Sequence, residues 1–127
     1  ILFPFISLAE TPPNTSEVAK AEKELIKITK NGLEPKNLTL KSLDGSVFFV
    51  NATEDALATI DINFNKRKVH CASSNMKINE DGHMLSTKPI GPKDFALTCF
   101  PDQGIYNVKV YGILAKEKPF EGTITVQ

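Results

Sequence analysis

The chain has 127 residues, and its 15 Lys and Arg balance its 15 Asp and Glu, so it carries no formal net charge at pH 7. A chain of this length forms one domain and buries roughly two-thirds of the surface that it exposes when unfolded, so folding requires neither a metal nor a disulfide. The charges are dispersed, and the one basic cluster, Lys66-Arg67-Lys68, is too small to indicate a nucleic-acid partner.

The chain begins with an apolar stretch, ILFPFISLA, in which the small residues Ser7 and Ala9 precede Glu10. This pattern resembles the end of a secretory signal peptide, so we expect an exported protein of the periplasm, the cell envelope or the extracellular space. An anchoring segment and an ordinary strand are the alternatives; residues 1–9 are too few to span a bilayer, which takes about 20 residues. Membrane association through residues 1–9 is compatible with a signal peptide and with an anchoring segment.

A proline-containing spacer and a short helical lead-in follow, so we divide the chain into an extension, residues 1–23, and a domain, residues 24–127. Residues 24–30 alternate in polarity and precede Asn31-Gly32, which predicts a strand and a turn, although a helix continuing to Lys30 is an alternative. Further strands are predicted over residues 37–41, 46–51, 58–64, 69–71, 95–100, 105–111 and 123–127.

The stretch 46–51 is almost wholly apolar, as expected of a strand that is covered on both faces. Residues 65–94 have a poorer pattern, with a turn at residues 79–82 and a proline-stiffened loop at residues 88–92. Seven or eight short strands without a long amphipathic helix predict an all-β fold, an antiparallel Greek-key sandwich or barrel.

Cys71 and Cys99 are the two cysteines. In an exported protein they are expected to form a disulfide, which adds roughly 3–4 kcal/mol of stability in the chain-entropy model. Two buried free thiols are the alternative, because cysteine packs as a small hydrophobic residue.

The chain resembles a cupredoxin, the fold of plastocyanin and of the copper domain of cytochrome oxidase subunit II. The resemblance covers about residues 24–64 and 95–127. It rests on the stretches ITKNGLEPKNLT (28–39), GSVFFVN (45–51), TEDALATI (53–60), FPDQGIY (100–106) and GTITV (122–126).

A blue-copper centre uses two imidazoles, a thiolate and a long axial thioether. The resemblance places the first His at Ala58, the Cys at Val110, the second His near Ile113 and the axial Met at Phe120. None of these side chains binds a metal, and Tyr111 to Gly122 contain no Cys, His or Met. The resemblance therefore implies a cupredoxin-like domain without the family's copper cofactor and without its electron-transfer chemistry.

A second, non-standard copper site is the alternative. The candidate ligands are His70, Cys71, Met76, His83 and Met84, whose soft donors favour Cu(I). Such a protein would be a Cu(I) carrier or an electron-transfer protein. The competing interpretation places Cys71 in a disulfide, the histidines in solvent and Met84 in the core.

No phosphate-binding loop, nucleophile elbow or activated cysteine is present, so we predict that the protein is not an enzyme. In copper-binding cupredoxins an apolar patch at the copper end meets the redox partner. The sequence therefore predicts a copper-free accessory subunit that binds a protein partner or larger complex through Ile113, Leu114 and Phe120. The alternative is that these side chains fill the space left by the metal.

Overall fold

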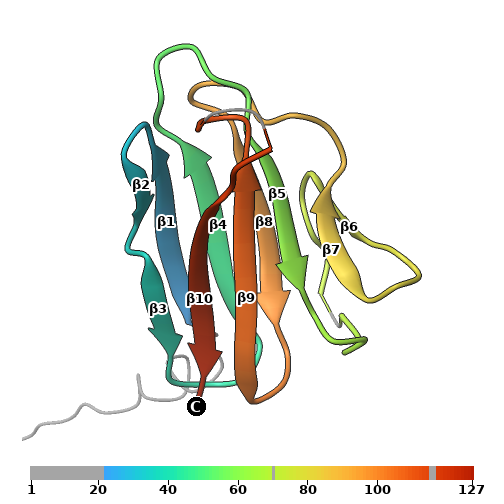
Figure 1. Ribbon diagram of the computed structural model, residues 1–127. Helices are drawn as coiled ribbons and strands as arrows, with labels where there is room; N and C mark the ends of the chain where they lie inside the picture. Colours follow the sequence, from blue (N-terminus) through green and yellow to red (C-terminus); the bar gives the residue numbers. More distant parts are fainter. Residues whose placement is uncertain (1–21, 70, 115–116) are drawn as a thin grey trace, which may run out of the picture.

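The computed structural model describes residues 22–69, 71–114 and 117–127, which form a β-sandwich (Figure 1). Within these ranges there are strands only, so no helix is available to cross a membrane. The strands are β1 (Lys23–Thr29), β2 (Gly32–Glu34), β3 (Asn37–Leu40), β4 (Gly45–Asn51), β5 (Thr59–Asn63), β6 (Met76–Ile78), β7 (His83–Ser86), β8 (Phe95–Phe100), β9 (Gly104–Tyr111) and β10 (Phe120–Val126).

The strands make two sheets, a four-stranded sheet with the order β2-β1-β4-β8 and a six-stranded sheet with the order β3-β10-β9-β5-β7-β6. The all-β sandwich predicted from the sequence is confirmed. Each sheet nevertheless contains one parallel pair, β1 with β4 and β3 with β10, so the sheets are mixed and not purely antiparallel. Ten strands form where seven or eight were predicted, because short strands flank two of the turns.

The differences from the predicted elements lie in the short strands. The predicted strand at 24–30 is confirmed as β1, and the turn after it is followed by β2, which pairs back onto β1. β6 and β7 form a hairpin around the predicted turn at 79–82. The strand predicted at 69–71 is wrong for Val69 and Cys71, which lie outside any strand, and His70 is outside the described residues.

The boundary between an extension (1–23) and a domain (24–127) remains a prediction, because residues 1–21 lie outside the described part of the chain. The predicted lead-in ends at Lys23, which is the first residue of β1. Glu22 already contacts the sandwich, since its carbonyl accepts a hydrogen bond from the Ser46 amide at 2.8 Å.

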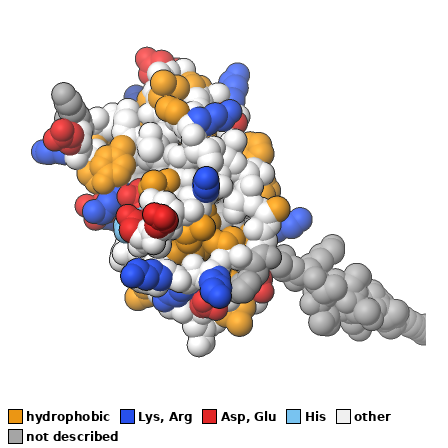
Figure 2. Space-filling model, turned by 90° about the vertical axis from the view of Figure 1, so that its right-hand side faces the viewer, with side chains coloured by type: hydrophobic (Ala, Val, Ile, Leu, Met, Phe, Trp, Pro, Cys, Tyr) orange, Lys and Arg blue, Asp and Glu red, His pale blue; other side chains and the backbone are white. Residues whose placement is uncertain are grey.

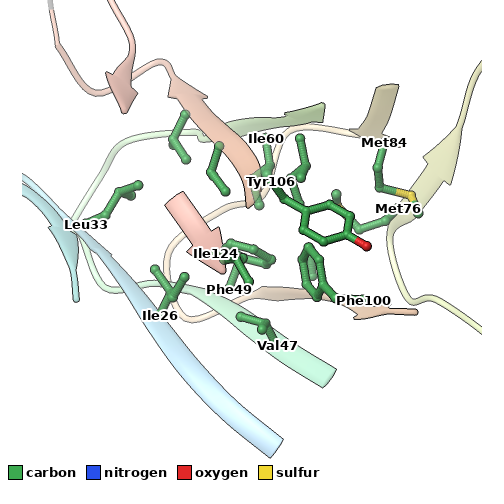
Figure 3. Close-up of a cluster of buried hydrophobic side chains, with 14 of the residues drawn as sticks. Ile26, Leu33, Val47, Phe49, Ile60, Met76, Met84, Phe100, Tyr106 and Ile124 are labelled. Atoms are coloured by element: carbon green, nitrogen blue, oxygen red, sulfur yellow. The ribbon is translucent and has the colours of Figure 1, made fainter. Parts of the chain in front are cut away.

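The core lies between the two sheets, where alternate residues of the long strands point inward (Figure 3). In β4, Val47 and Phe49 are fully buried, whereas Ser46, Phe48 and Val50 on the other face are only half-buried. The expectation that both faces of this strand are covered is therefore wrong within the described residues: the second face is the outer face of the sandwich.

The predicted disulfide is confirmed, because Cys71 and Cys99 are bonded. The bridge ties the segment 71–75 to β8, the edge strand of the smaller sheet. Beside it, the amide and carbonyl of Ser74 exchange hydrogen bonds of 2.9 Å with those of Leu97. The segment thus covers an edge that would otherwise expose unpaired backbone groups.

Tyr106 closes the core at one end of the sandwich, the end away from the start of β5. Its hydroxyl donates to the carbonyl of Asp102 at 2.9 Å, and its ring packs edge-on against Phe64 and Phe100. The Arg67 guanidinium lies 4.5 Å from the centre of the Tyr106 ring. Burial raises the pKa of Tyr106 above its ordinary value of 10.0, against the opposing effects of the Asp102 hydrogen bond and the Arg67 charge.

Candidate functional site

Four strand ends meet at the upper end of the sandwich in Figure 1: the end of β4, the start of β5, the end of β9 and the start of β10. For β5, β9 and β10 the register shows this, since Thr59 is opposite Tyr111 and Phe120 is opposite Val110. We call this the loop end. It consists of residues 52–58 and the described parts of 112–119, namely 112–114 and 117–119.

Asn51 fixes the first of these loops. Its side chain is fully buried, and its amide nitrogen donates to the carbonyls of Ala56, at 2.8 Å, and Ile90, at 2.7 Å. Its amide oxygen accepts from the amide of Thr53, at 2.9 Å, and from the Thr53 hydroxyl, at 2.6 Å. One side chain thus satisfies polar groups of two separate segments, and it sets the path of residues 52–57.

Gly112 fixes how closely the second loop approaches the first. It has a φ of +102°, which favours glycine, and a Cβ atom there would overlap the carbonyl oxygen of Leu57. The same Cβ atom would lie 3.7 Å from the Cα atom of Ala58. The backbone of residue 112 therefore packs directly against residues 57–58, and no larger residue fits at this position.

The structure brings the four positions assigned to copper ligands to this end. Ala58 and Val110 are completely buried, and Phe120 pairs with Val110 across β9 and β10. Ile113 and Phe120 pack against the core from its edge. All four side chains are hydrocarbon and supply no nitrogen, oxygen or sulfur donor, so they do not fit a copper ion.

Among the residues that the structure describes, the candidate ligands of the non-standard copper site do not form one cluster. Met76 and Met84 are buried in the core, whereas His83 points to the outer face, where its Nδ1 atom lies 2.7 Å from Oδ1 of Asp61. Cys71 is bonded to Cys99, so its sulfur is not a thiolate. His70 lies outside the described residues. Over residues 22–69, 71–114 and 117–127, His, Cys, Asp and Glu form no group of three or more that suits a metal.

Two leucines at the loop end are exposed. The exposed fraction is 57% for Leu57 and 43% for Leu114, and Ile113, which precedes Leu114 in the chain, is half-buried. A cavity of about 440 Å³ adjoins Ile113. It is lined by Thr29, Lys30, Asn31, Glu34, Ala52, Thr53, Glu54, Asp55, Ala56 and Ile113.

The charged side chains around this cavity are unequal in number, with carboxylates at Glu34, Glu54 and Asp55 and a single ammonium at Lys30. All four residues are exposed. The loop end therefore combines an apolar surface with a margin that is more acidic than basic.

A second cavity, of about 420 Å³, lies near the β6–β7 hairpin, with Lys66, Arg67 and Lys68 on its wall and Val69 and Ile78 in its lining. From this side of the molecule, hydrophobic side chains appear between charged ones (Figure 2). Besides facing the Tyr106 ring, Arg67 donates to the carbonyl of Phe64 at 3.4 Å. Arg67, the central residue of the basic cluster, is thus bound to other residues of the same domain.

Comparison with known proteins finds structural likeness and no sequence likeness: no family model and no curated protein matches the chain. Reduced auracyanin from Roseiflexus castenholzii superposes with a TM-score of 0.56 and 15% identity, covering 84% of this chain and 98% of that chain. The reduced Cu(I) form of an amicyanin variant superposes with a TM-score of 0.55 and 13% identity, covering 88% of each chain.

These solved structures are cupredoxins, so the described sandwich has the cupredoxin fold that the sequence predicted. At such low identity the likeness establishes the fold alone. What the site does must come from its own side chains, and at the family's ligand positions those are Ala58, Val110, Ile113 and Phe120.

The sequence predicted Ile113, Leu114 and Phe120 as contact residues, which remains a prediction, and it did not single out Leu57 or Asn51, which the structure also places at this end. Leu57 ends a polar connection between two strands, and an isolated leucine in such a connection forms no pattern that indicates a function. Its proximity to Gly112 is evident only in the structure. Asn51 appears in the sequence as the last residue of an apolar strand. A polar residue at the end of such a strand was the available clue to a buried anchor.

Proposed function

We propose that this protein is a non-enzymatic, copper-free cupredoxin-like module that binds a protein partner at its loop end. It acts as an accessory subunit of a larger assembly in the cell envelope or outside the cell. The observation that carries the proposal is the exposure of Leu57 and Leu114 at an end whose ligand positions are all hydrocarbon.

The chemistry of the ligand positions supports a role without copper. Ala58 and Val110 are fully buried, so at these two positions a hydrocarbon side chain packs in the core where a copper-binding cupredoxin has a ligand. This explains why these two side chains are apolar, but it does not explain Leu114, which fills no space in the core. An exposed leucine at the same end of the sandwich as a second exposed leucine has the character of a contact residue.

The cavity beside Ile113 indicates what the partner carries. Its apolar portion suits an aliphatic or aromatic side chain, and its margin of Glu34, Glu54 and Asp55 favours a neighbouring Lys or Arg. The partner segment is therefore apolar with an adjacent basic residue.

The confirmed disulfide supports the proposed export. Disulfides persist in oxidising compartments and are rare in the cytosol. The bond between Cys71 and Cys99 is thus consistent with a periplasmic, envelope or extracellular location.

The test is to co-purify the tagged full chain from its host and quantify the partner by mass spectrometry for the parent and for Leu114→Glu. Truncating a central contact typically costs 2 kcal/mol or more, so we expect recovery of the partner to fall about tenfold or more. Leu43→Glu is the matched control, because Leu43 is 52% exposed and lies in the β3–β4 turn at the opposite end.

Circular dichroism must show that both variants are folded. Undiminished recovery of the partner with folded Leu114→Glu would remove the loop end as the contact. Equal loss with Leu43→Glu would show that the effect is not specific to the loop end.

A further inference from the structure

The cavity of about 420 Å³ beside the β6–β7 hairpin has no part in the proposed function. It lies between residues 66–69 on one side and residues 78–80 and 82 on the other, and we call it the basic cavity. The described residues of the loop end do not line it. Whatever binds in the basic cavity is therefore distinct from the partner proposed for the loop end.

Two tight turns that pack against each other fix the walls of the basic cavity. Asn65 and Lys66 have left-handed φ values of 51° and 65°, and the amide of Arg67 closes this turn by donating to the carbonyl of Phe64 at 2.9 Å. The amide of Phe64 in turn donates to the carbonyl of Gly82 at 3.0 Å. A Cβ atom at Gly82 would lie only 2.6 Å from the backbone nitrogen of Lys66, so the two turns meet backbone to backbone. The position of Lys66 is thus set by the fold before any ligand binds.

Val69 and Ile78 give the basic cavity an apolar lining. Both side chains pack against the core and are only half-buried, so they are held in place and still accessible. The methylene stems of the lysines that line the cavity add to this apolar surface. Hydrophobic side chains between charged ones are visible on this side of the molecule (Figure 2). An apolar group that enters the cavity is removed from water, which favours binding.

The charge around this apolar lining is mainly positive. Lys66, Arg67 and Lys68 line the cavity together with one carboxylate, that of Glu80. The Arg67 guanidinium is directed to the ring of Tyr106, 4.5 Å from its centre. Neither Lys66 nor Lys68 forms an ion pair with a carboxylate of the described residues, and both are exposed. These two ammonium groups are therefore the ones that an anion can bind.

We propose that the basic cavity binds a small amphipathic anion. The apolar body of this ligand packs on Val69 and Ile78, and its single carboxylate, sulfate or phosphate group binds Lys66 and Lys68. A lysine suits such a group because it is a compact charge with three rotatable donors. The volume of the cavity lies within the range of small-molecule sites, roughly 300–1,000 Å³. Glu80 repels further negative charge, so a polyanion such as a nucleic acid fits less well.

The first experiment is calorimetric titration of the full chain with decyl sulfate, below the concentration at which this probe forms micelles. We expect saturable binding of one molecule per chain. Decyltrimethylammonium has the same apolar tail and the opposite charge, and inorganic sulfate has the charge without the tail. Each should bind at least about tenfold more weakly than decyl sulfate.

Substitutions assign the charge to the cavity. Lys66→Gln/Lys68→Gln should weaken the binding of decyl sulfate about tenfold or more, because the charged hydrogen bonds to the head group are lost. Lys27→Gln/Lys41→Gln is the matched control, because it removes the same two charges at exposed positions that do not line the cavity. It should leave the dissociation constant within about twofold.

A third variant tests the apolar lining. Val69→Ser should weaken the binding of decyl sulfate about threefold or more, because less apolar surface is removed from water. Its binding of inorganic sulfate should match that of the parent.

The position of the probe is read from amide chemical shifts of the parent. The amides of Lys66, Val69 and Gly82 should shift together as decyl sulfate is added and reach saturation at the same concentration. The amides of Ala56 and Gly112, at the loop end, should not move.

Four outcomes would overturn the proposal. They are an absence of saturable binding, equally tight binding of decyltrimethylammonium, equal loss of affinity in Lys27→Gln/Lys41→Gln, and shifts at the loop end in place of the cavity. If decyl sulfate does not bind but phosphatidylglycerol vesicles bind the parent and not Lys66→Gln/Lys68→Gln, the two lysines belong to a membrane-binding surface instead.

Discussion

Asn51 is the single residue on which the loop end depends most. It is uncharged, completely buried and hydrogen-bonded to Ala56, Ile90 and Thr53. These partners belong to segments that are far apart in the sequence. The exposed Leu57 follows the segment that Asn51 holds, so a fully buried side chain sets the path of the loop that carries Leu57.

We expect Asn51→Ala to lower the free energy of unfolding by about 2–4 kcal/mol, because it removes four hydrogen bonds made by a fully buried side chain and leaves a cavity in its place. Asn51→Asp keeps the acceptor toward Thr53 but loses both donors, and it should be at least as damaging. Urea denaturation measures both. Asn107→Ala, at an exposed position on β9, should change stability by no more than about 0.5 kcal/mol.

A fully stable Asn51→Asp protein would contradict this role, because it would show that the two donated hydrogen bonds contribute nothing. If Asn107→Ala were as costly as Asn51→Ala, the effect would not be specific to the buried position.

At the scale of residues, the sequence could predict what the ligand positions lack but not what the loop end presents. Ala58, Val110 and Phe120 follow from short stretches with fixed spacing, and the structure brings them together. The loop end also depends on the close approach of Gly112 to the backbone carbonyl of Leu57, more than fifty residues earlier in the chain. Spacing within one segment carries no information about such a contact.

At the scale of elements, the segment 71–75 acts as a cover for β8. The disulfide holds it at Cys99, the hydroxyls of Ser73 and Thr98 lie 2.9 Å apart, and Ser74 pairs with Leu97. These contacts satisfy the outer edge of the sheet over much of its length. The poor pattern of residues 65–94 in the sequence reflects this irregular path.

Reduction of the disulfide, or the double substitution Cys71→Ala/Cys99→Ala, is expected to lower the free energy of unfolding by about 3–4 kcal/mol for the sequence separation of 28 residues. Hydrogen exchange should also become faster at the amides of Ser74 and Leu97, because the cover loosens before the rest of the sheet. Amides of β9 and β10 serve as internal controls. Unchanged stability together with unchanged exchange at Ser74 and Leu97 would contradict the role of the cover.

The long strands were predictable and the short ones were not. β4, β8 and β9 have six or more residues each, long enough for alternation in polarity to be recognised. β2 and β6 have three residues each, and their extended conformation comes from pairing with β1 and β7. The parallel pairing of β1 with β4 depends on which strands become neighbours in the sandwich, which polarity does not encode.

At the scale of the whole molecule, the chain has the cupredoxin fold. The side chains at the positions of the cupredoxin copper ligands are apolar, like the side chains of a protein core. The rest of the core agrees with this. Apart from Asn51 and Thr98, the buried side chains that the structure describes are apolar, and Tyr106 closes the core at the far end. The side chains at the positions of the cupredoxin copper ligands therefore supply no donor atom for a redox ion.

The measurement that tests the central claim most directly is the amount of copper bound per chain, after incubation with Cu(II) in air and with Cu(I) under anaerobic conditions, followed by removal of free metal. The account predicts no stoichiometric copper and no blue colour in either case. One equivalent of tightly bound copper that gives a blue protein would contradict the claim that the ligand positions hold only carbon.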